Sequence, residues 1–347
     1  MSTILPLKQQ IALGTLLGKS PQFLKEVRKV PVVAETDVSI LITGETGTGK
    51  ELFARAIHYL SKRSPGPFVP VNCGAIPVEL MESELFGHEQ GSFTGAVSRK
   101  PGLVQEAQGG TLFLDEIDTL TLHAQVKLLR FLQEKECRPV GSTKTEKADV
   151  RVISATNIQV DAALRSGRLR TDLYYRLNIM CLAIPPLRQR QEDIRILAGH
   201  FLKKYSLEFG KCVEGFSQAA IQALTCYDWP GNVRELERLM ERAVALATGN
   251  VIELEDLPPG IGGDYGEILL PSFKRTESLK MWACRYARLM LERCQGNKRE
   301  TARALGISYH TLISYLRGGE EDGATTKGKV LAAPDGALPQ DTVETVS

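Results

Sequence analysis

A glycine-rich turn between an apolar run and an amphipathic segment constrains the fold of this chain more than any other feature of its sequence. Residues 38–42 read VSILI, and residues 44–50 read GETGTGK. Apolar residues then recur at helical spacing, at Leu52, Phe53, Ala56, Ile57 and Leu60. This order predicts a buried strand, a loop and a helix.

Four further short apolar runs follow, and segments with helical spacing separate them. The runs occupy residues 68–72, 111–115, 151–156 and 179–184. Strands that alternate with helices predict an α/β fold with a parallel sheet and helices on both faces. From Ile194 to about Ala247 the pattern is helical only, so we expect an all-α subdomain after the sheet.

Composition and charge limit the classes of protein to which the chain can belong. It has no run of eighteen apolar residues and no basic start before an apolar stretch, so we expect no membrane span and no secretory signal. Its seven cysteines are never spaced as C-x-x-C, which argues against a disulfide framework or a zinc site. Residues 273–317 hold ten Lys or Arg and three Asp or Glu, a net +7 that predicts a nucleic-acid partner.

The turn at residues 44–50 fits the pattern G-x-x-x-x-G-K of phosphate-binding loops. Its backbone N–H groups can surround phosphate oxygens, and Lys50 can reach the β- and γ-phosphates. Glu51 stands where Ser or Thr would ligate Mg²⁺. A glycine-rich turn that binds nothing is the alternative for this motif alone. The candidate nucleotide contacts are Gly44, Glu45, Thr46, Gly47, Thr48, Gly49, Lys50 and Glu51.

Two carboxylates end the apolar run in GGTLFLDE, residues 109–116. Ligands of α/β sheets bind at the carboxyl ends of the strands. There Asp115 can hold Mg²⁺, directly or through water, and Glu116 can polarise a water for attack on the γ-phosphate. A solvated turn is the alternative for this pair alone. Both motifs in this order predict a nucleotide triphosphatase.

Phosphoryl transfer also needs positive charge at the transition state, which an arginine finger supplies. The stretch GRLRTDLYYRLNI, residues 167–179, offers Arg168, Arg170 and Arg176. If the last two serve the site of a neighbouring subunit, the enzyme works only as an oligomer. Surface arginines on a helical segment are the alternative.

From about Leu16 to Leu257 the chain resembles the AAA+ domain of bacterial enhancer-binding proteins, the sigma-54-dependent transcriptional activators. The motifs GETGTGKE, ELFGHEQGSFTGA, GGTLFLDEID, ATN, LRTDLYYRLN and WPGNVREL occur in the order of that family. The family pattern also accommodates Glu51. The resemblance implies an ATPase that uses Mg²⁺ and works as a homo-oligomeric ring, usually hexameric, with ATP between subunits; a dimer at rest stays open.

The resemblance also implies roles for single residues. Lys50 is the lysine of the phosphate loop, and Asp115 and Glu116 are the magnesium-binding and water-activating acids. Asn72 resembles the switch that restrains the catalytic Glu, and Asn157 the sensor of the γ-phosphate. Arg170 and Arg176 match the arginine fingers that act on a neighbouring subunit. Arg234 matches the lid arginine that senses the nucleotide.

The uncharged loop GSFTGA matches the family loop that contacts sigma-54, whose usual form is GAFTGA. Phe93 and Thr94 are retained, and Ser92 replaces Ala with a hydroxyl that we expect to be solvated. Packing of Phe93 on its own subunit is the alternative. A second loop, residues 140–148, is a candidate support. The predicted contact residues are Gly91, Ser92, Phe93, Thr94, Gly95 and Ala96.

Residues 297–317 read as helix, glycine turn and helix, and they resemble the Fis-type helix-turn-helix that ends most of these activators. We expect Leu305, Ile307, Leu312 and Tyr315 in its core, with Ala302 where the helices cross. Residues 308–311 would lie near base edges in the major groove. A dimerisation bundle without DNA contact is the alternative. The candidate DNA contacts are Lys298, Arg299, Arg303, Ser308, Tyr309, His310, Thr311 and Arg317.

The predicted boundaries are a short lead at 1–15, the α/β ATPase subdomain at 16–186 and the helical lid at 187–257. A linker at 258–273, the helix-turn-helix at 274–318 and a disordered tail at 319–347 follow. Only about fifteen residues precede the ATPase motifs, so we expect no receiver or ligand-sensing domain there. Control would then come from a separate regulatory protein, from expression level or from hetero-assembly.

Together these features predict a cytoplasmic, nucleoid-associated bacterial activator. It would bind double-stranded DNA upstream of promoters and use ATP to remodel closed complexes of the sigma-54 RNA polymerase holoenzyme. One alternative is a DNA-binding regulator with a vestigial ATPase. Another is a AAA+ remodeller of a different protein target.

Overall fold

The computed structural model describes residues 14–93, 95–258, 260–261 and 279–317. The chain divides into two compact units, Met1–Gly262 and Gly263–Ser347. The predicted tail, nearly all of the lead, most of the linker and Thr94 of the candidate contact loop lie outside the described residues.

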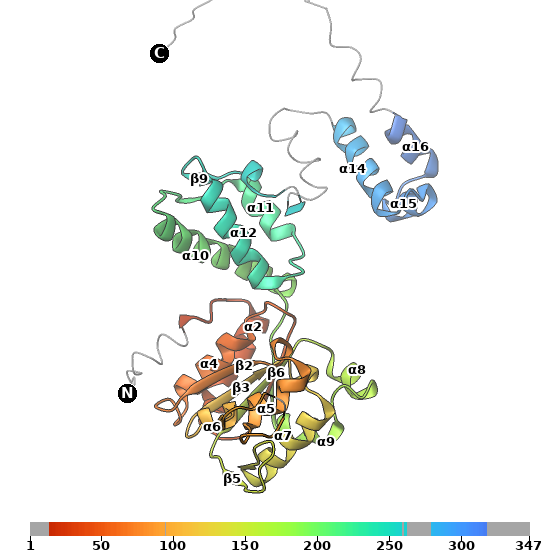
Figure 1. Cartoon of the computed structure of the whole chain (residues 1–347). Coiled ribbons are helices and arrows are strands. Elements are labelled where there is room, and N and C mark those ends of the chain that lie inside the picture. Colours follow the sequence, from red (N-terminus) through yellow and green to blue (C-terminus); the bar gives the residue numbers. More distant parts are fainter. Residues whose placement is uncertain (1–13, 94, 259, 262–278, 318–347) are drawn as a thin grey trace, which may run out of the picture. The chain divides into compact units, whose positions relative to one another are not determined.

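The first unit contains a five-stranded sheet, and all its strands are parallel (Figure 1). The strand order is β2-β3-β6-β1-β7. The predicted α/β fold with a parallel sheet is therefore confirmed, and each strand overlaps one of the apolar runs that predicted it. The strands are β1 (Ile40–Thr43), β2 (Phe68–Asn72), β3 (Thr111–Asp115), β6 (Arg151–Thr156) and β7 (Met180–Ala183).

Helices cover both faces of this sheet, and alternate residues of β3 show why. Phe113 points into a core that it shares with α2 (Pro21–Val27), α3 (Lys29–Ala34) and α4 (Lys50–Leu60). Leu112 and Leu114 point into the opposite core. Because both faces are dry, the strands read as continuous apolar runs rather than as alternating patterns. The opposite core is built with α5 (Met81–Phe86), α6 (Leu103–Glu106), α7 (Leu122–Glu134), α8 (Val160–Arg165) and α9 (Thr171–Leu177).

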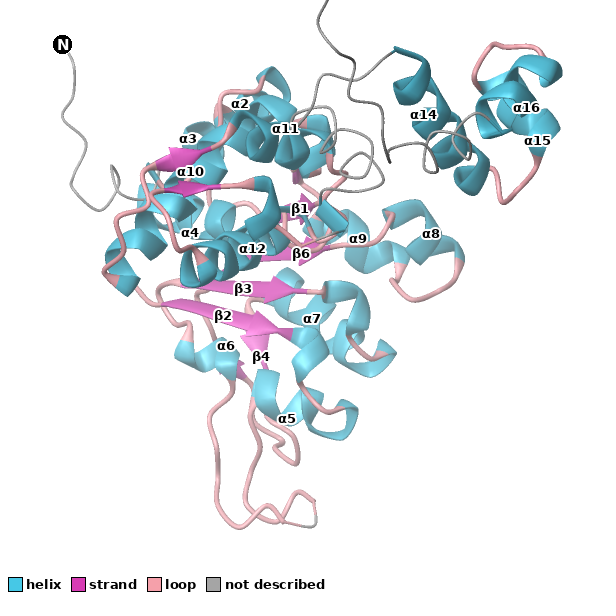
Figure 2. Ribbon diagram, turned by 90° about the horizontal axis from the view of Figure 1, so that it is seen from above, coloured by secondary structure: helices cyan, strands magenta, loops and turns pink. Residues whose placement is uncertain are grey.

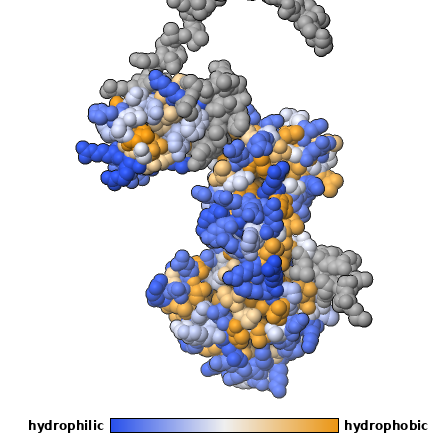
Figure 3. Space-filling view, turned by 180° about the vertical axis from the view of Figure 1, so that it is seen from behind, coloured by the Kyte–Doolittle hydropathy of each residue, from blue (hydrophilic) through white to orange (hydrophobic). Residues whose placement is uncertain are grey.

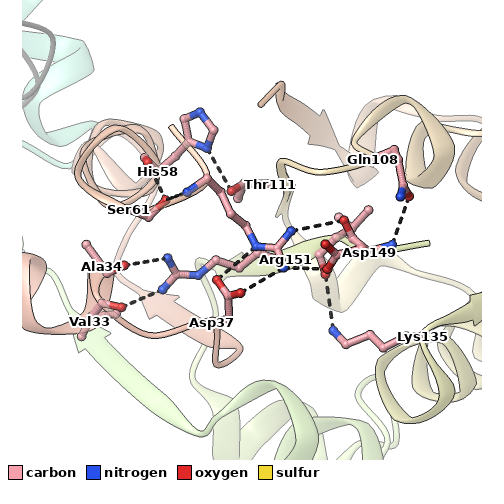
Figure 4. A network of polar contacts seen from close by, with 12 residues as sticks. Val33, Ala34, Asp37, His58, Ser61, Gln108, Thr111, Lys135, Asp149 and Arg151 are labelled. Atoms are coloured by element: carbon pink, nitrogen blue, oxygen red, sulfur yellow. Dashed lines mark hydrogen bonds and ion pairs between the residues drawn. The ribbon is translucent and has the colours of Figure 1, made fainter. Parts of the chain in front are cut away.

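A polar network fixes the amino-terminal edge of the sheet (Figure 4). The buried guanidinium of Arg151 donates to the carbonyl oxygens of Val33 and Ala34 at the end of α3, at 2.7 and 3.4 Å. Burial lowers the pKa of Arg151 to about 10. Hydrogen bonds to carbonyls at a helix end stabilise a cation there, so this side chain ties α3 to β6.

After the sheet, the described part of the first unit contains three longer helices and a small sheet. The helices are α10 (Gln191–Phe209), α11 (Gln218–Cys226) and α12 (Asn232–Leu246). The prediction of a purely helical segment was wrong at β8 (Gly215–Phe216), which pairs in parallel with β9 (Val251–Ile252). A two-residue strand is too short to carry a periodic pattern. The same is true of the antiparallel pair β4 (Glu136–Cys137) and β5 (Glu146–Lys147) in the α/β part.

The second unit contains α14 (Leu279–Arg293), α15 (Lys298–Ala304) and α16 (Tyr309–Arg317). Its core joins Ala287, Ala302 and Leu312, and the predicted core residues Leu305, Ile307 and Tyr315 pack against it. Gly306 makes the turn between α15 and α16 with a φ of 65°, a conformation that favours glycine.

The visible face of the α/β part mixes hydrophilic and hydrophobic residues (Figure 3). Within the described residues, no helix combines the length and the apolar character needed to cross a membrane.

Candidate active site

The glycine turn connects the carboxyl end of β1 to α4, as the sequence predicts. Gly49 caps α4 in the left-handed conformation, with a φ of 98°, and Lys50 is the first residue of the helix. The Lys50 ammonium donates to the carbonyl oxygens of Gly44 and Glu45, at 2.9 and 3.2 Å. Burial lowers the pKa of Lys50, although the charges of Asp115 and Glu116 oppose this shift.

The backbone of the turn touches the helical part of the first unit at Gly47. Its carbonyl oxygen accepts from the N–H groups of Val233 and Arg234, at 3.0 and 3.3 Å. Gly47 has a φ of 79°, and a side chain on it would collide with the carbonyl oxygen of Gly231. Glycine is therefore required here for both conformation and space.

A pocket of about 570 Å³ opens beside this turn. It brings together the predicted phosphate lysine, the two acids, the switch Asn and the lid arginine, which lie far apart in the sequence. Its wall also includes residues of the extreme amino-terminal segment and of α10. The lining includes Gly14, Leu17, Lys50, Asn72, Asp115, Glu116, His200, Phe201 and Arg234.

The two acids lie at the carboxyl edge of the sheet, where Asp115 of β3 pairs in register with Asn72 of β2. Asp115 accepts from the backbone N–H of Glu116 at 3.0 Å. Glu116 has φ 56° and ψ 46°, which is left-handed backbone in a residue with a side chain. Such a conformation costs about 1–3 kcal/mol and is found mostly where function requires it. Its carbonyl oxygen accepts from the Thr119 hydroxyl at 2.7 Å, which helps to hold this geometry.

Asn72 and Glu116 meet at Gly74. The Asn72 side chain accepts from the Gly74 N–H at 2.9 Å. A methyl group on Gly74 would collide with Oε2 of Glu116 and would lie 3.3 Å from Oδ1 of Asn72. The structure thus brings the predicted switch pair to one point, and among the described residues no hydrogen bond joins the two side chains directly.

Asn157, the residue that follows β6, contacts the glycine turn. Its Nδ2 donates to the Thr46 hydroxyl at 3.1 Å. The side chain therefore reaches the loop that would hold phosphates, although Asn157 is not among the residues that line the pocket.

The two predicted fingers lie outside the pocket of their own chain. Arg170 precedes α9, and its exposed guanidinium pairs with Asp172 at 2.7 Å. Arg176, in the last turn of α9, donates to the carbonyl oxygen of Leu132 at 3.1 Å. Neither arginine is brought to Lys50, Asp115 or Glu116 of the same chain.

Sequence reasoning missed two polar groups that shape this pocket. Asn232 is buried and has a left-handed backbone, with a φ of 53°. Its side-chain amide donates to the Glu45 carboxylate and to the carbonyl oxygen of Thr46. Its side-chain oxygen accepts from the N–H of Leu187 at 2.8 Å. The sequence GNV alone gives only a weak turn pattern for it. Arg188 also pairs with Glu45.

The second missed group is the buried carboxylate of Asp193 in α10. It accepts from the backbone N–H groups of Lys19 and Ser20, at 2.6 and 2.9 Å, and from the guanidinium of Arg190 at 2.9 Å. Burial opposes the charge, yet these hydrogen bonds leave the pKa of Asp193 below its ordinary value. The cluster holds the segment that contributes Gly14 and Leu17 to the pocket wall.

Comparison with known proteins shows the family to which the chain belongs. A family model described as "Sigma-54 interaction domain" matches residues 16–183, and one described as "AAA+ ATPase lid domain" matches residues 188–266. The regulatory protein AtoC of Escherichia coli K12 is 46% identical over 310 residues, which cover 88% of this chain and 67% of AtoC. The transcriptional regulatory protein ZraR of the same strain is 47% identical, with 87% and 68% covered. The chain belongs to the sigma-54 activator family.

Solved structures agree with this assignment. A crystal structure of NtrX from Brucella abortus in complex with ATP has a TM-score of 0.68 and 33% identity, and covers 90% of this chain and 72% of NtrX. One of NtrX in complex with ADP has a TM-score of 0.66 and 35% identity, with 87% and 68% covered. This member of the sigma-54 activator family is therefore an ATPase of the AAA+ type with a helical lid.

The described part of the candidate contact loop, residues 91–93 and 95–96, projects beyond α5 (Figure 2). Gly91 and Gly95 have left-handed φ values of 78° and 103°. Phe93 is 37% exposed, and its ring contacts His88 edge-on at 5.0 Å. Thr94 lies outside the described residues.

The second loop packs directly against the contact loop. Val140 exchanges backbone hydrogen bonds with Gly87 and Glu89. A Cβ on Gly141 would lie 2.6 Å from the Cβ of Ser92. The expectation of a solvated Ser92 hydroxyl was wrong: its oxygen is buried and has no hydrogen-bond partner in the described structure, because the second loop covers it.

The candidate DNA contacts of the second unit are arranged around α15 and α16. Lys298, Arg299 and Arg303 are exposed on or near α15, and Tyr309 and His310 are exposed at the start of α16. Ser308 precedes α16 and its hydroxyl accepts from the Thr311 N–H at 3.0 Å, so it caps the helix. Arg317 ends α16, and its side chain lies outside the described part.

Proposed function

We propose that this protein is an ATP-hydrolysing transcriptional activator that binds DNA upstream of promoters and remodels closed complexes of sigma-54 RNA polymerase. Membership of the sigma-54 activator family supports this proposal. The observation that carries it is that the predicted catalytic residues lie in two separate places on one chain. The phosphate lysine and the acids share a pocket, whereas the two arginines that could complete it lie elsewhere.

Because Arg170 and Arg176 do not reach their own pocket, they are available to a neighbouring subunit. An arginine finger stabilises the transition state of phosphoryl transfer by roughly 10³–10⁵-fold in rate. We therefore propose a homo-oligomeric ring, hexameric when active, in which each ATP lies between two subunits. Isolated protomers would hydrolyse ATP slowly.

The residues of the pocket fit ATP with Mg²⁺. No group of three or more His, Cys, Asp or Glu in the described ranges is arranged to hold a metal, and Mg²⁺ is usually held by one or two carboxylates together with substrate phosphates. Asp115 is the proposed ligand, and the bound ion would neutralise phosphate charge. Lys50 grips the β- and γ-phosphates, and Glu116 prepares the attacking water. Asn157 and Arg234 would also contact the nucleotide.

The contact loop is the proposed surface for sigma-54. Phe93 is partly exposed between two glycines, so a partner can bury it without displacing a packed core. Full burial of a Phe side chain contributes roughly 1.5–3 kcal/mol. The backbone pairing of the two loops supplies a base from which the tip can move with the nucleotide state.

The second unit is the proposed DNA-binding domain. Its basic residues would contact phosphates, while residues 308–311, just before and in the first turn of α16, would approach base edges. Specific binding should weaken as salt rises, with a log–log slope set by the number of phosphates contacted. Deletion of residues 274–347 should abolish site-specific binding and leave most ATPase activity at high protein concentration. Unchanged specific binding by the truncated protein would overturn this assignment.

One experiment tests the ring, and another tests the target. Subunits carrying Arg170→Ala and subunits carrying Lys50→Ala should each be inactive but should regain turnover when mixed, because some interfaces then combine an intact pocket with an intact finger. Absence of rescue at every ratio, with assembly intact, contradicts action on a neighbour. For the target, the wild-type protein and ATP should open a sigma-54 promoter in a purified system. Normal ATP turnover with neither promoter opening nor sigma-54 binding would point to another protein target.

A further inference from the structure

Gln125 is a fully buried side chain of α7 that the chemistry described so far does not use. Both N–H donors of its amide are used, and its oxygen accepts one hydrogen bond. The Nε2 donates to the carbonyl oxygens of Leu120 and Arg168, at 2.9 and 2.7 Å. The Oε1 accepts from the backbone N–H of Arg170 at 2.9 Å.

This pattern fixes the backbone on which the proposed fingers stand. The amide bonds to the C=O of one residue and to the N–H of the residue two positions later, as a neighbouring strand would. Leu169, between them, is buried. Arg170 is the residue that precedes α9, so the amide sets where that helix begins. The same α7 also accepts a hydrogen bond from Arg176 through Leu132.

The bond from Gln125 to Leu120 connects it to the segment that follows the two acids, Asp115 and Glu116, of the same subunit. Leu120 directly follows the short 3₁₀ helix Ile117–Thr119, and that helix begins immediately after Glu116. A single side chain therefore bonds both to the segment after Glu116 and to the segment that carries Arg170. The bond to Leu120 is buried, and the bonds to Arg168 and Arg170 are partly buried. A buried carbonyl or N–H group that loses its partner is left unsatisfied.

We propose that Gln125 is a positioning residue: it holds Arg170, and through α9 Arg176, in the place from which they serve the neighbouring subunit. The inference rests on the proposed function, because it assumes that these arginines act on a neighbour. A misplacement of about 1 Å at a reacting centre can cost on the order of 10²-fold in rate. Loss of the amide should therefore lower turnover without removing any group that touches ATP.

The test is a complementation assay in which Gln125→Met subunits are mixed with subunits that carry other substitutions. Methionine has nearly the same length and cannot form the three hydrogen bonds. Alone, the variant should turn over ATP on the order of 10²-fold more slowly than the parent, with a KM for ATP within a few-fold of the parental value. Mixed with Lys50→Ala subunits it should regain turnover, because its own pocket is intact. Mixed with Arg170→Ala subunits it should not, because neither partner supplies a placed finger.

Other outcomes overturn the proposal in distinguishable ways. Rescue by Arg170→Ala subunits would place the defect in the variant's own pocket. Rescue by neither partner, although the protein assembles, would indicate a general structural defect. If Arg170→Ala and Lys50→Ala fail to rescue each other in the same assay, the proposed function itself is wrong, and this inference falls with it.

Two further variants keep the test interpretable. Gln133→Met makes the same substitution at an exposed position of α7 and should turn over ATP like the parent. If Gln125→Met does not fold, Gln125→Asn takes its place, since it keeps the amide but withdraws it by one methylene. The Asn variant should then show the same complementation pattern, and parental turnover by this variant would contradict the proposal.

Discussion

Replacing Asn232 tests how much one buried amide contributes to the connection between the lid and the glycine turn. The side chain is fully buried, and it contacts three backbone or side-chain groups of two other segments. Asn232→Ala removes these contacts and keeps the left-handed φ of 53°. Asn232→Gly removes the same contacts but tolerates that φ without strain.

The contacts do not contribute equally to the free energy of unfolding. The N–H of Leu187 is buried, so losing its acceptor should cost about 1–3 kcal/mol. The carbonyl oxygen of Thr46 belongs to an exposed residue that water can reach, and Glu45 keeps its pair with Arg188. A left-handed Ala adds about 1 kcal/mol. We therefore expect a loss of about 2–4 kcal/mol for Asn232→Ala and about 1 kcal/mol less for Asn232→Gly.

Urea unfolding followed by tryptophan fluorescence measures this loss in the lid. The chain has two tryptophans, so a Trp282→Phe background leaves the buried Trp229 as the reporter. Asn250→Ala, at an exposed position, is the control and should stay within about 0.5 kcal/mol of the parent. ATP affinity should also fall for Asn232→Ala, because the amide holds Glu45 and Thr46. A loss no larger than that of the control, or a Gly variant less stable than the Ala variant, would refute the reasoning.

Three further predictions follow from the site and the core. Glu116→Ala should bind ATP like the parent but release phosphate roughly 10²–10⁴-fold more slowly, which is the usual contribution of a general base. Nucleotide binding and phosphate release, measured on the same preparations, check this. Turnover above about a tenth of the parental rate would exclude Glu116 as the general base. Phe93→Ala should keep its ATPase rate within a few-fold and lose promoter opening, whereas Ser92→Ala should be neutral or slightly stabilising because it removes a buried hydroxyl without a partner; both are read from open complexes and thermal unfolding. Burial lowers the pKa of His58 to about 4 from an ordinary 6.5, so the unfolded chain takes up this proton first. Stability should be full above pH 6.5 and fall by about 3 kcal/mol towards pH 4, and His58→Gln should flatten that fall in urea titrations.

Much of the α/β part could be predicted from sequence because its strands are buried on both faces. β2, β3 and β6 begin and end at the predicted residues, since each coincides with a short continuous apolar run. The positions of the candidate catalytic side chains could be predicted for a related reason. A glycine turn before a helix and paired acids after a strand are local patterns, and parallel strands bring their carboxyl ends to one edge.

The contacts between distant segments could not be predicted. Gln125, Asn232 and Asp193 are single polar residues in helical stretches, and nothing in their spacing separates them from exposed polar residues. Their importance comes from burial and from partners more than forty positions away, such as Arg170 for Gln125 and Lys19 for Asp193. Ser92 shows the same limit, because the loop that covers its hydroxyl is also distant in sequence.

Two of these distant contacts share one geometric property. Asn232 joins the glycine turn to the lid, and Gln125 joins the segment after Glu116 to the segment that carries the proposed finger Arg170. Close packing and saturated hydrogen bonds make such joints stiff, so a small displacement at the phosphates is passed on rather than absorbed. The contact loop is built differently, with two left-handed glycines around a partly exposed Phe93 and a single packed base at Gly141. Rigid contacts near the proposed ATP site and a flexible tip at the proposed partner surface suit a mechanical element. Such an element must move as one body and still adapt to the surface that it contacts.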